Sequence, residues 1–197
     1  MSEIAPSRVE YFCKAYDEHL WGKGSGIGSK QEHTVRYRQI LETLLREQEV
    51  HSVLDVGCGD CQCFAMIRWG GVQYTGIDIV PGLVSYLNRH WGSLNIHFVH
   101  GDVLAMQVLP PADLLIIKDV MQHWTDEEIL HFLPTLDRYR LALVTNDIDD
   151  RQHSYKWHGR WRPVDLRRPP FSRRGEVLFE NRAIPGSPPK VTMLMRS

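Results

Sequence analysis

The chain has 197 residues, of which 43% are hydrophobic and 24% charged, and its formal net charge is −1 at pH 7. This length predicts one domain with a full hydrophobic core. The near-neutral charge excludes a surface that is basic throughout, as a non-specific nucleic-acid binder would have. The sequence shows no apolar run long enough to span a membrane and no signal-peptide pattern. Its four cysteines fit no disulfide framework, so we expect a cytoplasmic protein without a membrane partner.

Hydrophobic periodicity predicts alternating helices and strands along most of the chain. Helices are expected at residues 7–20, 35–48, 62–69, 81–91 and 125–139. The first five strands are expected at residues 52–56, 72–78, 95–100, 113–118 and 141–145. Short connections between these elements favour a doubly wound α/β fold, in which a mostly parallel sheet carries helices on both faces.

Two further segments depart from this alternation. Four glycines fall within residues 22–28 and predict a loop after the first helix. Near the C-terminus, strand-like residues 176–181 and 190–196 flank a turn rich in proline. They predict an antiparallel hairpin at the sheet edge, which brings the sheet to seven strands.

The strand at 52–56 runs into a turn built on Gly57 and Gly59. Glycines there let a ligand lie against the backbone, and this strand-turn arrangement is typical of the nucleotide-binding corner of a parallel sheet. Asp78 ends the next strand, nineteen residues after Gly59, where a carboxylate can accept hydrogen bonds from ribose hydroxyls. Gln62 stands where a dinucleotide fingerprint needs Gly or Ala, which argues against a dinucleotide.

Two more strand ends complete a pattern. Gly101-Asp102 follows the third strand, and the segment from Asp113 to Asp119 contains the fourth. In order and spacing, these elements resemble the motifs of the class I S-adenosylmethionine-dependent methyltransferases over about residues 35–147. The family's Gly-x-Gly-x-Gly turn has Cys61 in its third glycine position here. The resemblance implies a Rossmann-like methyltransferase domain with S-adenosylmethionine as its cofactor.

The resemblance also assigns roles to residues at the strand ends. Asp55 would orient the glycine turn, Asp78 would bind the ribose and Asp102 would hold the adenine amino group. Val103 would pack on the adenine ring, and Lys118 would line the pocket wall. The expected cofactor-binding residues are Asp55, Gly57, Cys58, Gly59, Asp78, Ile79, Asp102, Val103 and Lys118.

Two titratable residues after the fourth strand are candidates for catalysis. Asp119 and His123 are four residues apart, so a helical turn would place them on one face. A hydroxyl oxygen is a poor nucleophile until its proton leaves, and histidine is the side chain best suited to take a proton at neutral pH. We therefore predict His123 or Asp119 as the proton acceptor, with Trp124 beside the methyl acceptor. The alternative is a His123 that packs under Trp124 or caps a helix.

A second resemblance concerns metal ions. Catechol O-methyltransferase-like enzymes hold Mg²⁺ with an Asp after the fourth strand and an Asp-Asn pair after the fifth. This chain offers Asp119, Asn146 and Asp147, with the pair in reverse order. Neighbouring side chains on an extended strand point in opposite directions, so we expect no metal site. A Mg²⁺-dependent O-methyltransferase stays open as an alternative.

Basic residues are concentrated in the last part of the chain. Residues 151–197 contain eleven Lys and Arg and three acidic residues, so the rest of the chain is net acidic. Guanidinium groups bind phosphates and carboxylates in bidentate fashion. We predict that acceptor binding involves Asn146, Arg160, Arg162, Arg167 and Arg168. The alternative is a solvated, charged flap.

These features predict one domain in three sections. Residues 1–34 would form an N-terminal helix and a Gly-rich lid, 35–147 the cofactor-binding core, and 148–197 a basic flap and edge hairpin. The predicted function is methyl transfer from S-adenosylmethionine to an oxygen of a small acceptor, anionic through a phosphate, nucleotide or carboxylate group. An RNA or nucleotide methyltransferase and a non-catalytic S-adenosylmethionine-binding protein are the alternatives. Nucleic acid is not expected as a partner, and the oligomeric state is left open.

Overall fold

The computed structural model describes residues 7–148, 161–181 and 188–197 of the chain. Within these residues, seven strands form one sheet in the order β3-β2-β1-β4-β5-β7-β6. The strands are β1 (Ser52–Val56), β2 (Gln73–Asp78), β3 (Ile96–His100), β4 (Leu114–Lys118), β5 (Leu141–Asp147), β6 (Glu176–Asn181) and β7 (Lys190–Arg196). Strands β1 to β5 are parallel, and β7 runs antiparallel between β5 and β6. The predicted mostly parallel sheet with a C-terminal hairpin is confirmed.

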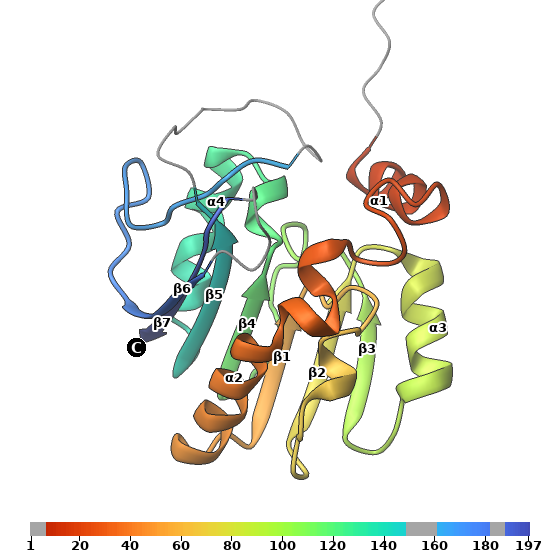
Figure 1. Ribbon diagram of the computed structural model, residues 1–197, viewed down its shortest axis with the longest axis horizontal. Coiled ribbons are helices and arrows are strands. Elements are labelled where there is room, and N and C mark those ends of the chain that lie inside the picture. The colour runs from red at the N-terminus through yellow and green to blue at the C-terminus, as the bar shows by residue number, and fades with distance from the viewer. Residues whose placement is uncertain (1–6, 149–160, 182–187) are drawn as a thin grey trace, which may run out of the picture.

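Helices cover both faces of this sheet, as predicted (Figure 1). The covering helices are α2 (Val35–Glu47), α3 (Pro81–Trp91) and α4 (Asp126–Leu136), and α1 (Arg8–Asp17) lies above the carboxyl edge of the sheet. Buried side chains of α2 and α3, such as Leu41 and Leu87, belong to one hydrophobic cluster. Those of α4, such as Phe132 and Leu133, belong to another. The sheet therefore separates two cores, which makes the fold a three-layer α/β sandwich.

The residues of β4 show why this strand is central. Leu114 and Ile116 face the core under α2 and α3, whereas Leu115 and Ile117 face the core under α4. All four side chains are buried. A parallel strand covered on both faces needs such an uninterrupted apolar run. The run ends at Lys118 and Asp119, so polar groups begin where the strand reaches the open edge of the sheet.

One predicted helix is wrong. Residues 62–69 were expected to be helical, but the structure has only a short 3₁₀ turn, Phe64–Met66. The segment lies between Cys61 and Gly70, which both have a positive φ, of 63° and 58°. Too few residues remain between these two positions to nucleate a stable α-helix. Instead, the aromatic ring of Phe64 packs against Tyr74 in the core.

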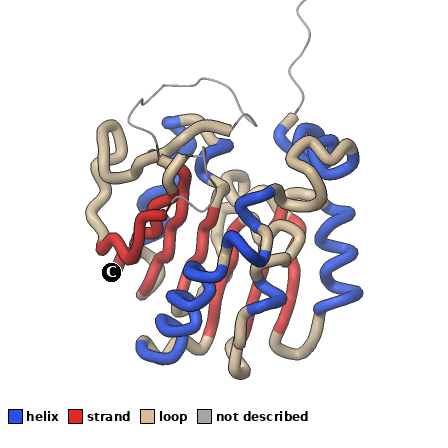
Figure 2. The backbone as a smooth tube through the Cα atoms, viewed as in Figure 1, coloured by secondary structure: helices blue, strands red, loops and turns tan. Residues whose placement is uncertain are grey.

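The carboxyl ends of the parallel strands meet at one edge of the sheet, where the loops and α1 gather (Figure 2). The loop after β4 is fixed by a capping box at the start of α4, in which Thr125 and Glu128 exchange hydrogen bonds. The loops at this edge of the sheet are therefore fixed in place by the strands and helices to which they connect. No helix in the described part of the chain is long and apolar enough to cross a membrane.

Candidate functional site

The turn after β1 is built so that its backbone is exposed to a ligand. Gly57 and Gly59 have φ values of 68° and 60°, a region that favours glycine. A Cβ added at Gly57 would collide with Val120, and one added at Gly59 would collide with Ser25. Cys61, in the place of the family's third glycine, adopts a φ of 63° although it carries a side chain. The chain thus keeps the backbone shape of the turn without its third glycine.

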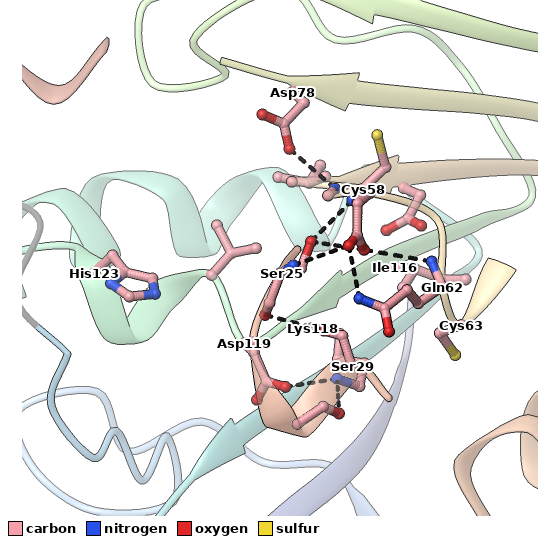
Figure 3. A pocket seen from close by; sticks show the side chains of 18 of the residues that line it. Ser25, Ser29, Cys58, Gln62, Cys63, Asp78, Ile116, Lys118, Asp119 and His123 are labelled. Carbon is pink, nitrogen blue, oxygen red and sulfur yellow. Dashed lines mark hydrogen bonds and ion pairs between the residues drawn. The ribbon is translucent and has the colours of Figure 1, made fainter. Parts of the chain in front are cut away.

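A cavity of about 470 Å³ opens beside this turn. Ligands of open α/β sheets bind at this place, outside the carboxyl ends of the strands. The N-terminal segment lines the cavity from the other side. All nine expected cofactor-binding residues line it, together with Asp119, His123, Trp124 and Asp147. Figure 3 shows Asp78, Asp119 and His123 around this space.

Asp78 connects the ends of β1 and β2. Its Oδ2 accepts a hydrogen bond from the Gly59 N–H, and its Oδ1 accepts one from the Val80 N–H, both at 3.0 Å. A carboxylate can accept about four hydrogen bonds, so each oxygen keeps a lone pair for a ligand. Burial raises the pKa of Asp78, and the backbone N–H groups of Val80, Gly59 and Ile79 oppose this shift. The arrangement suits a ligand with two neighbouring hydroxyl groups.

Asp55 lies below the glycine turn in a partly buried position. The Tyr74 hydroxyl donates a hydrogen bond to its Oδ2 at 2.7 Å. Burial raises the pKa of Asp55 to about 7, although Tyr74 and Lys118 oppose the shift. Asp55 is therefore a weakly acidic group on the cavity wall, close to its titration point at neutral pH.

Asp102 contacts the N-terminal helix, which sequence reasoning did not anticipate. Arg8 Nη1 in α1 donates to Asp102 Oδ2 at 2.9 Å, and Arg8 also pairs with Glu128 at the start of α4. The Leu104 N–H donates to the other Asp102 oxygen at 3.0 Å. Arg8 therefore fixes α1 over the cavity and neutralises a carboxylate expected to face adenine.

The Gly-rich loop docks on the glycine turn through one pair of residues. Ser25 N–H and Oγ donate to the Asp60 carboxylate at 3.0 and 2.9 Å, and Asp60 N–H donates back to Ser25 Oγ at 2.8 Å. The Tyr16 hydroxyl lies 2.7 Å from the same Oγ. These reciprocal bonds hold residues 22–28 across the mouth of the cavity. The pattern of the sequence indicated a loop here but not its partner, Asp60.

Asp119 is held by two lysines. Its carboxylate lies 2.6 Å from Lys118 Nζ and 2.7 Å from Lys190 Nζ. Burial alone would raise its pKa, but the two ammonium groups outweigh burial and lower the pKa to about 2. A carboxylate so far from neutral is a poor general base. The ion pairs therefore favour His123 over Asp119 as the proton acceptor, and the role of Asp119 stays a prediction.

Asp119 and His123 also do not share a helical face. Asp119 has a φ of 60°, and only a short 3₁₀ turn, Met121–His123, follows it. The His123 ring lies on the cavity wall with its centre 5.3 Å from Phe12 and 5.7 Å from Trp21. Its place between aromatic rings of the N-terminal segment puts it at the end of the cavity away from the glycine turn (Figure 3).

Two other predicted acceptor residues, Trp124 and Asn146, are buried. The Trp124 side chain is 4% exposed and its ring packs on Phe132 in the core, so its indole is a structural element of the α4 side. Asn146 is also buried, and its Oδ1 has no hydrogen-bond partner among the described residues. Because side chains alternate along β5, Asn146 faces the same side as Val144, opposite to Asp147. Trp124 still lines the cavity, whereas Asn146 is not among the lining residues, and the acceptor-binding roles of both stay predictions.

The candidate metal ligands are separated by a lysine. Lys190 Nζ lies between Asp119 Oδ1 and Asp147 Oδ1, at 2.7 and 2.8 Å. The Trp161 indole N–H donates to the other oxygen of Asp147 at 2.8 Å. Within the described residues, no group of three His, Cys, Asp or Glu side chains could hold a metal ion. Asn146 points away, so the three predicted oxygen ligands do not converge.

The described arginines of the basic flap pair with acidic residues of the same chain. Arg162 is buried, donates to the Trp124 carbonyl and pairs with Asp126 at 2.6 Å. Arg167 and Arg168 both pair with Asp165. These ion pairs favour a structural role for the described arginines, their role in acceptor binding stays a prediction, and Arg160 lies outside the described residues. The ion pair between Arg162 and Asp126 could not be predicted from the local sequence, because the two residues are far apart along the chain.

Comparison with known proteins agrees with the fold and the glycine turn. Residues 53–139 match the family described as a methyltransferase domain. A malonyl-[acyl-carrier protein] O-methyltransferase from Acetivibrio thermocellus is 30% identical over 96 residues, 45% of this chain and 34% of that protein. A pluviatolide O-methyltransferase from Sinopodophyllum hexandrum is 35% identical over 103 residues, 49% of this chain and 26% of that protein. The chain thus spans about a third or less of the length of these curated relatives.

Solved structures show the same fold at low sequence identity. The N-methyltransferase NodS from Bradyrhizobium japonicum, in complex with S-adenosylhomocysteine, superposes with a TM-score of 0.64 at 12% identity. The match covers 85% of this chain and 88% of NodS. Human N-acetylserotonin methyltransferase, in complex with S-adenosylmethionine, gives 0.57 at 20% identity and covers 96% and 55% of the two chains. The family match over residues 53–139, the relatives and the fold all agree with the expected resemblance to the class I S-adenosylmethionine-dependent methyltransferases.

Proposed function

We propose that this chain transfers a methyl group from S-adenosylmethionine to a hydroxyl oxygen of a small-molecule acceptor. The observation that carries the proposal is a single cavity with two different ends. One end presents the glycine turn and Asp78, and the other presents His123 among aromatic rings. Both curated relatives are named O-methyltransferases, which supports oxygen as the site of transfer.

The residues present fit the cofactor. Gly57 and Gly59 let Val120 and Ser25 approach the backbone of the turn at the cavity wall, and the Asp78 carboxylate keeps acceptor capacity for a ribose diol. When bound, S-adenosylmethionine supplies a methyl carbon that is activated by a positively charged sulfur. Asp78 would orient the nucleoside, and the pair Ser25–Asp60 would keep the Gly-rich loop closed over it. Closure excludes water and holds the reactants in register, which accounts for much of the rate in such reactions.

His123 is our candidate for the proton acceptor. It lines the cavity at the aromatic end, and imidazole can take a proton at neutral pH. With Asp119 tied to Lys118 and Lys190, His123 is the better base of the two predicted residues. General-base catalysis of this kind contributes about 10²- to 10⁴-fold to the rate.

We infer the charge of the acceptor from the charged side chains in and near the cavity. The expectation of an anionic acceptor rested on arginines that the structure pairs with Asp126 and Asp165. The lysines on the cavity wall, Lys118 and Lys190, are paired with carboxylates as well. A planar hydroxylated acceptor without net charge at its reacting end therefore fits the cavity better than a phosphorylated one.

The compartment is part of the same proposal. Cys13, Cys58, Cys61 and Cys63 are free thiols in the structure. Unpaired cysteines persist in reducing compartments, so we place the protein in the cytoplasm.

A turnover assay tests the function. S-Adenosylhomocysteine formation is measured with a panel of small phenols and alcohols, and with the matching amines and phosphate esters as separate arms. We expect product with at least one neutral hydroxylated compound. Product only with amines would contradict transfer to oxygen, and product only with phosphate esters would restore the anionic acceptor.

A further inference from the structure

The acceptor end of the cavity contains a positive charge that no sequence motif predicted. Lys190 comes from the first position of β7, and its ammonium group lies within 2.8 Å of carboxylates of both Asp119 and Asp147. The three side chains are 10–16% exposed. Lys190 is the cross-strand partner of Asp147 in the β5–β7 ladder, so the sheet fixes its position. The cation is therefore part of the framework and not a mobile surface group.

The geometry resembles an oxygen-ligated cation site with lysine as the cation. Mg²⁺ and Mn²⁺ are commonly held by one or two carboxylates, with water or substrate oxygens as the other ligands. Here two carboxylates, one after β4 and one at the end of β5, converge on one ammonium nitrogen. An ammonium has three N–H donors, two of which are directed at Asp119 and Asp147. The Lys190 side chain also lines the cavity, so the group can face a bound molecule.

We propose that the Lys190 ammonium is the fixed cation of the acceptor site and takes the place that a divalent metal would have between Asp119 and Asp147. This inference rests on the proposed methyl transfer and adds to it a positioning residue. As the acceptor hydroxyl loses its proton, negative charge grows on its oxygen, and a preorganised positive charge nearby stabilises that change. The chain carries this charge covalently and needs no free cation for it.

Removal of the lysine side chain gives a sharp test. In Lys190→Ala, the Asp147 carboxylate would lose its ammonium partner and Asp119 would keep only Lys118, so the space between the two carboxylates would lack a cation, which is unfavourable. The vacated space should then accept a divalent ion. Mn²⁺ is the probe, and the readout is the melting temperature during a Mn²⁺ titration without cofactor or acceptor. At about tenfold excess over Kd, binding should raise the melting temperature by about 3–5 °C.

Several variants make the result specific. Lys190→Gln has a side chain of similar length and guards against a Lys190→Ala protein that does not fold, and it should also gain a Mn²⁺ response. Lys190→Arg keeps the positive charge and should gain none. The double variant Lys190→Ala/Asp147→Asn removes one carboxylate and should lose the response. Arg196→Ala, on the same strand but paired with Glu176 at the surface, is the control for loss of a cation elsewhere.

The proposal is overturned if neither Lys190→Ala nor Lys190→Gln gains a saturable response to Mn²⁺. It is also overturned if the unaltered protein responds as strongly as the variants, because the site would then admit a metal with Lys190 present. The titration contains no S-adenosylmethionine, so a negative result here is separate from a failure of the proposed methyl transfer. That failure would appear as absence of cofactor binding or of turnover in the unaltered protein.

Discussion

The backbone N–H of Gly59 donates a hydrogen bond to Oδ2 of Asp78 at 3.0 Å. This bond joins the turn after β1 to the end of β2, two segments that the sequence separates by nineteen residues. It fixes the Asp78 carboxylate beside the exposed backbone of the turn. The two groups thus form one ligand-binding surface, and the account of this protein as a methyltransferase depends on that surface.

His123→Ala should reduce turnover by about 10²- to 10⁴-fold while the affinity for S-adenosylmethionine stays nearly the same. The reason is the position of the ring at the aromatic end of the cavity, against Phe12 and Trp21. Turnover is measured as S-adenosylhomocysteine formation and affinity by calorimetry. His131→Ala, on the exposed surface of α4, is the matched control. A His123 variant with normal turnover across neutral pH would show that the ring is only a packing element.

Asp55 should make the protein less stable as the pH rises from about 4 to 7. Its pKa in the folded state is raised to about 7 by burial, whereas the unfolded chain has an ordinary carboxyl pKa. The folded state therefore binds the extra proton in this range, and the free energy of unfolding falls as the pH rises, by about 4 kcal/mol in all. Urea denaturation at several pH values measures the slope. Asp55→Asn should flatten it, and an unchanged slope would mean that Asp55 titrates normally.

At position 61, substitution of Cys61 by Gly should destabilise the protein less than substitution by Ala, which is the reverse of the usual order. At most buried positions, Ala is tolerated better than Gly, but Cys61 has a φ of 63°, where a side chain is strained. Both variants lose the buried thiol, and Cys61→Gly should be about 1 kcal/mol more stable than Cys61→Ala. Thermal melting of the two proteins side by side checks this. A higher melting temperature for the Ala variant would contradict the left-handed backbone at this position.

Arg162→Gln should lower stability without an effect on cofactor affinity. The guanidinium is buried, bonds the Trp124 carbonyl and pairs with Asp126, so its loss leaves a partly buried carboxylate unpaired. Such a loss costs about 3–5 kcal/mol. Arg168→Gln, on a half-exposed side chain, should cost less than about 1 kcal/mol and serves as the control. Equal melting temperatures for the two variants would mean that Arg162 has no special structural role and is again a candidate for acceptor binding.

The strands of the sheet could be predicted from the sequence because each strand is marked by its own consecutive residues. Apolar runs such as 114–117 mark buried strands, and polar residues such as Asp78 mark the points where strands end. The glycine turn was equally readable, since Gly57 and Gly59 follow a strand directly. A mostly parallel sheet of seven strands with an antiparallel C-terminal hairpin follows from these signals and from the family resemblance, whereas the strand order comes from the structure.

The polar pairs of the site were not predicted, because they join distant parts of the chain. Arg8–Asp102 spans 94 residues and Lys190–Asp119 spans 71. Neither the hydrophobic periodicity nor the motif spacing of the sequence indicates such a pair. Lys190 lies opposite Asp147 in the β5–β7 ladder, a register that the sequence did not predict. Asp119 pairs with its neighbour Lys118 and with the distant Lys190, and the second of these partners could not be predicted from the local sequence.

Calorimetric titration of the purified protein with S-adenosylmethionine tests the central claim most directly. The account predicts saturable binding at one site per chain, and a large loss of affinity in Asp78→Ala. That variant loses two charge-assisted hydrogen bonds to ribose hydroxyls, worth about 1.5–3 kcal/mol each. Asp137→Ala, an exposed carboxylate that pairs with Arg173 away from the cavity, should bind like the unaltered protein. No heat of binding in the unaltered protein, or equal affinity in Asp78→Ala, would contradict the account.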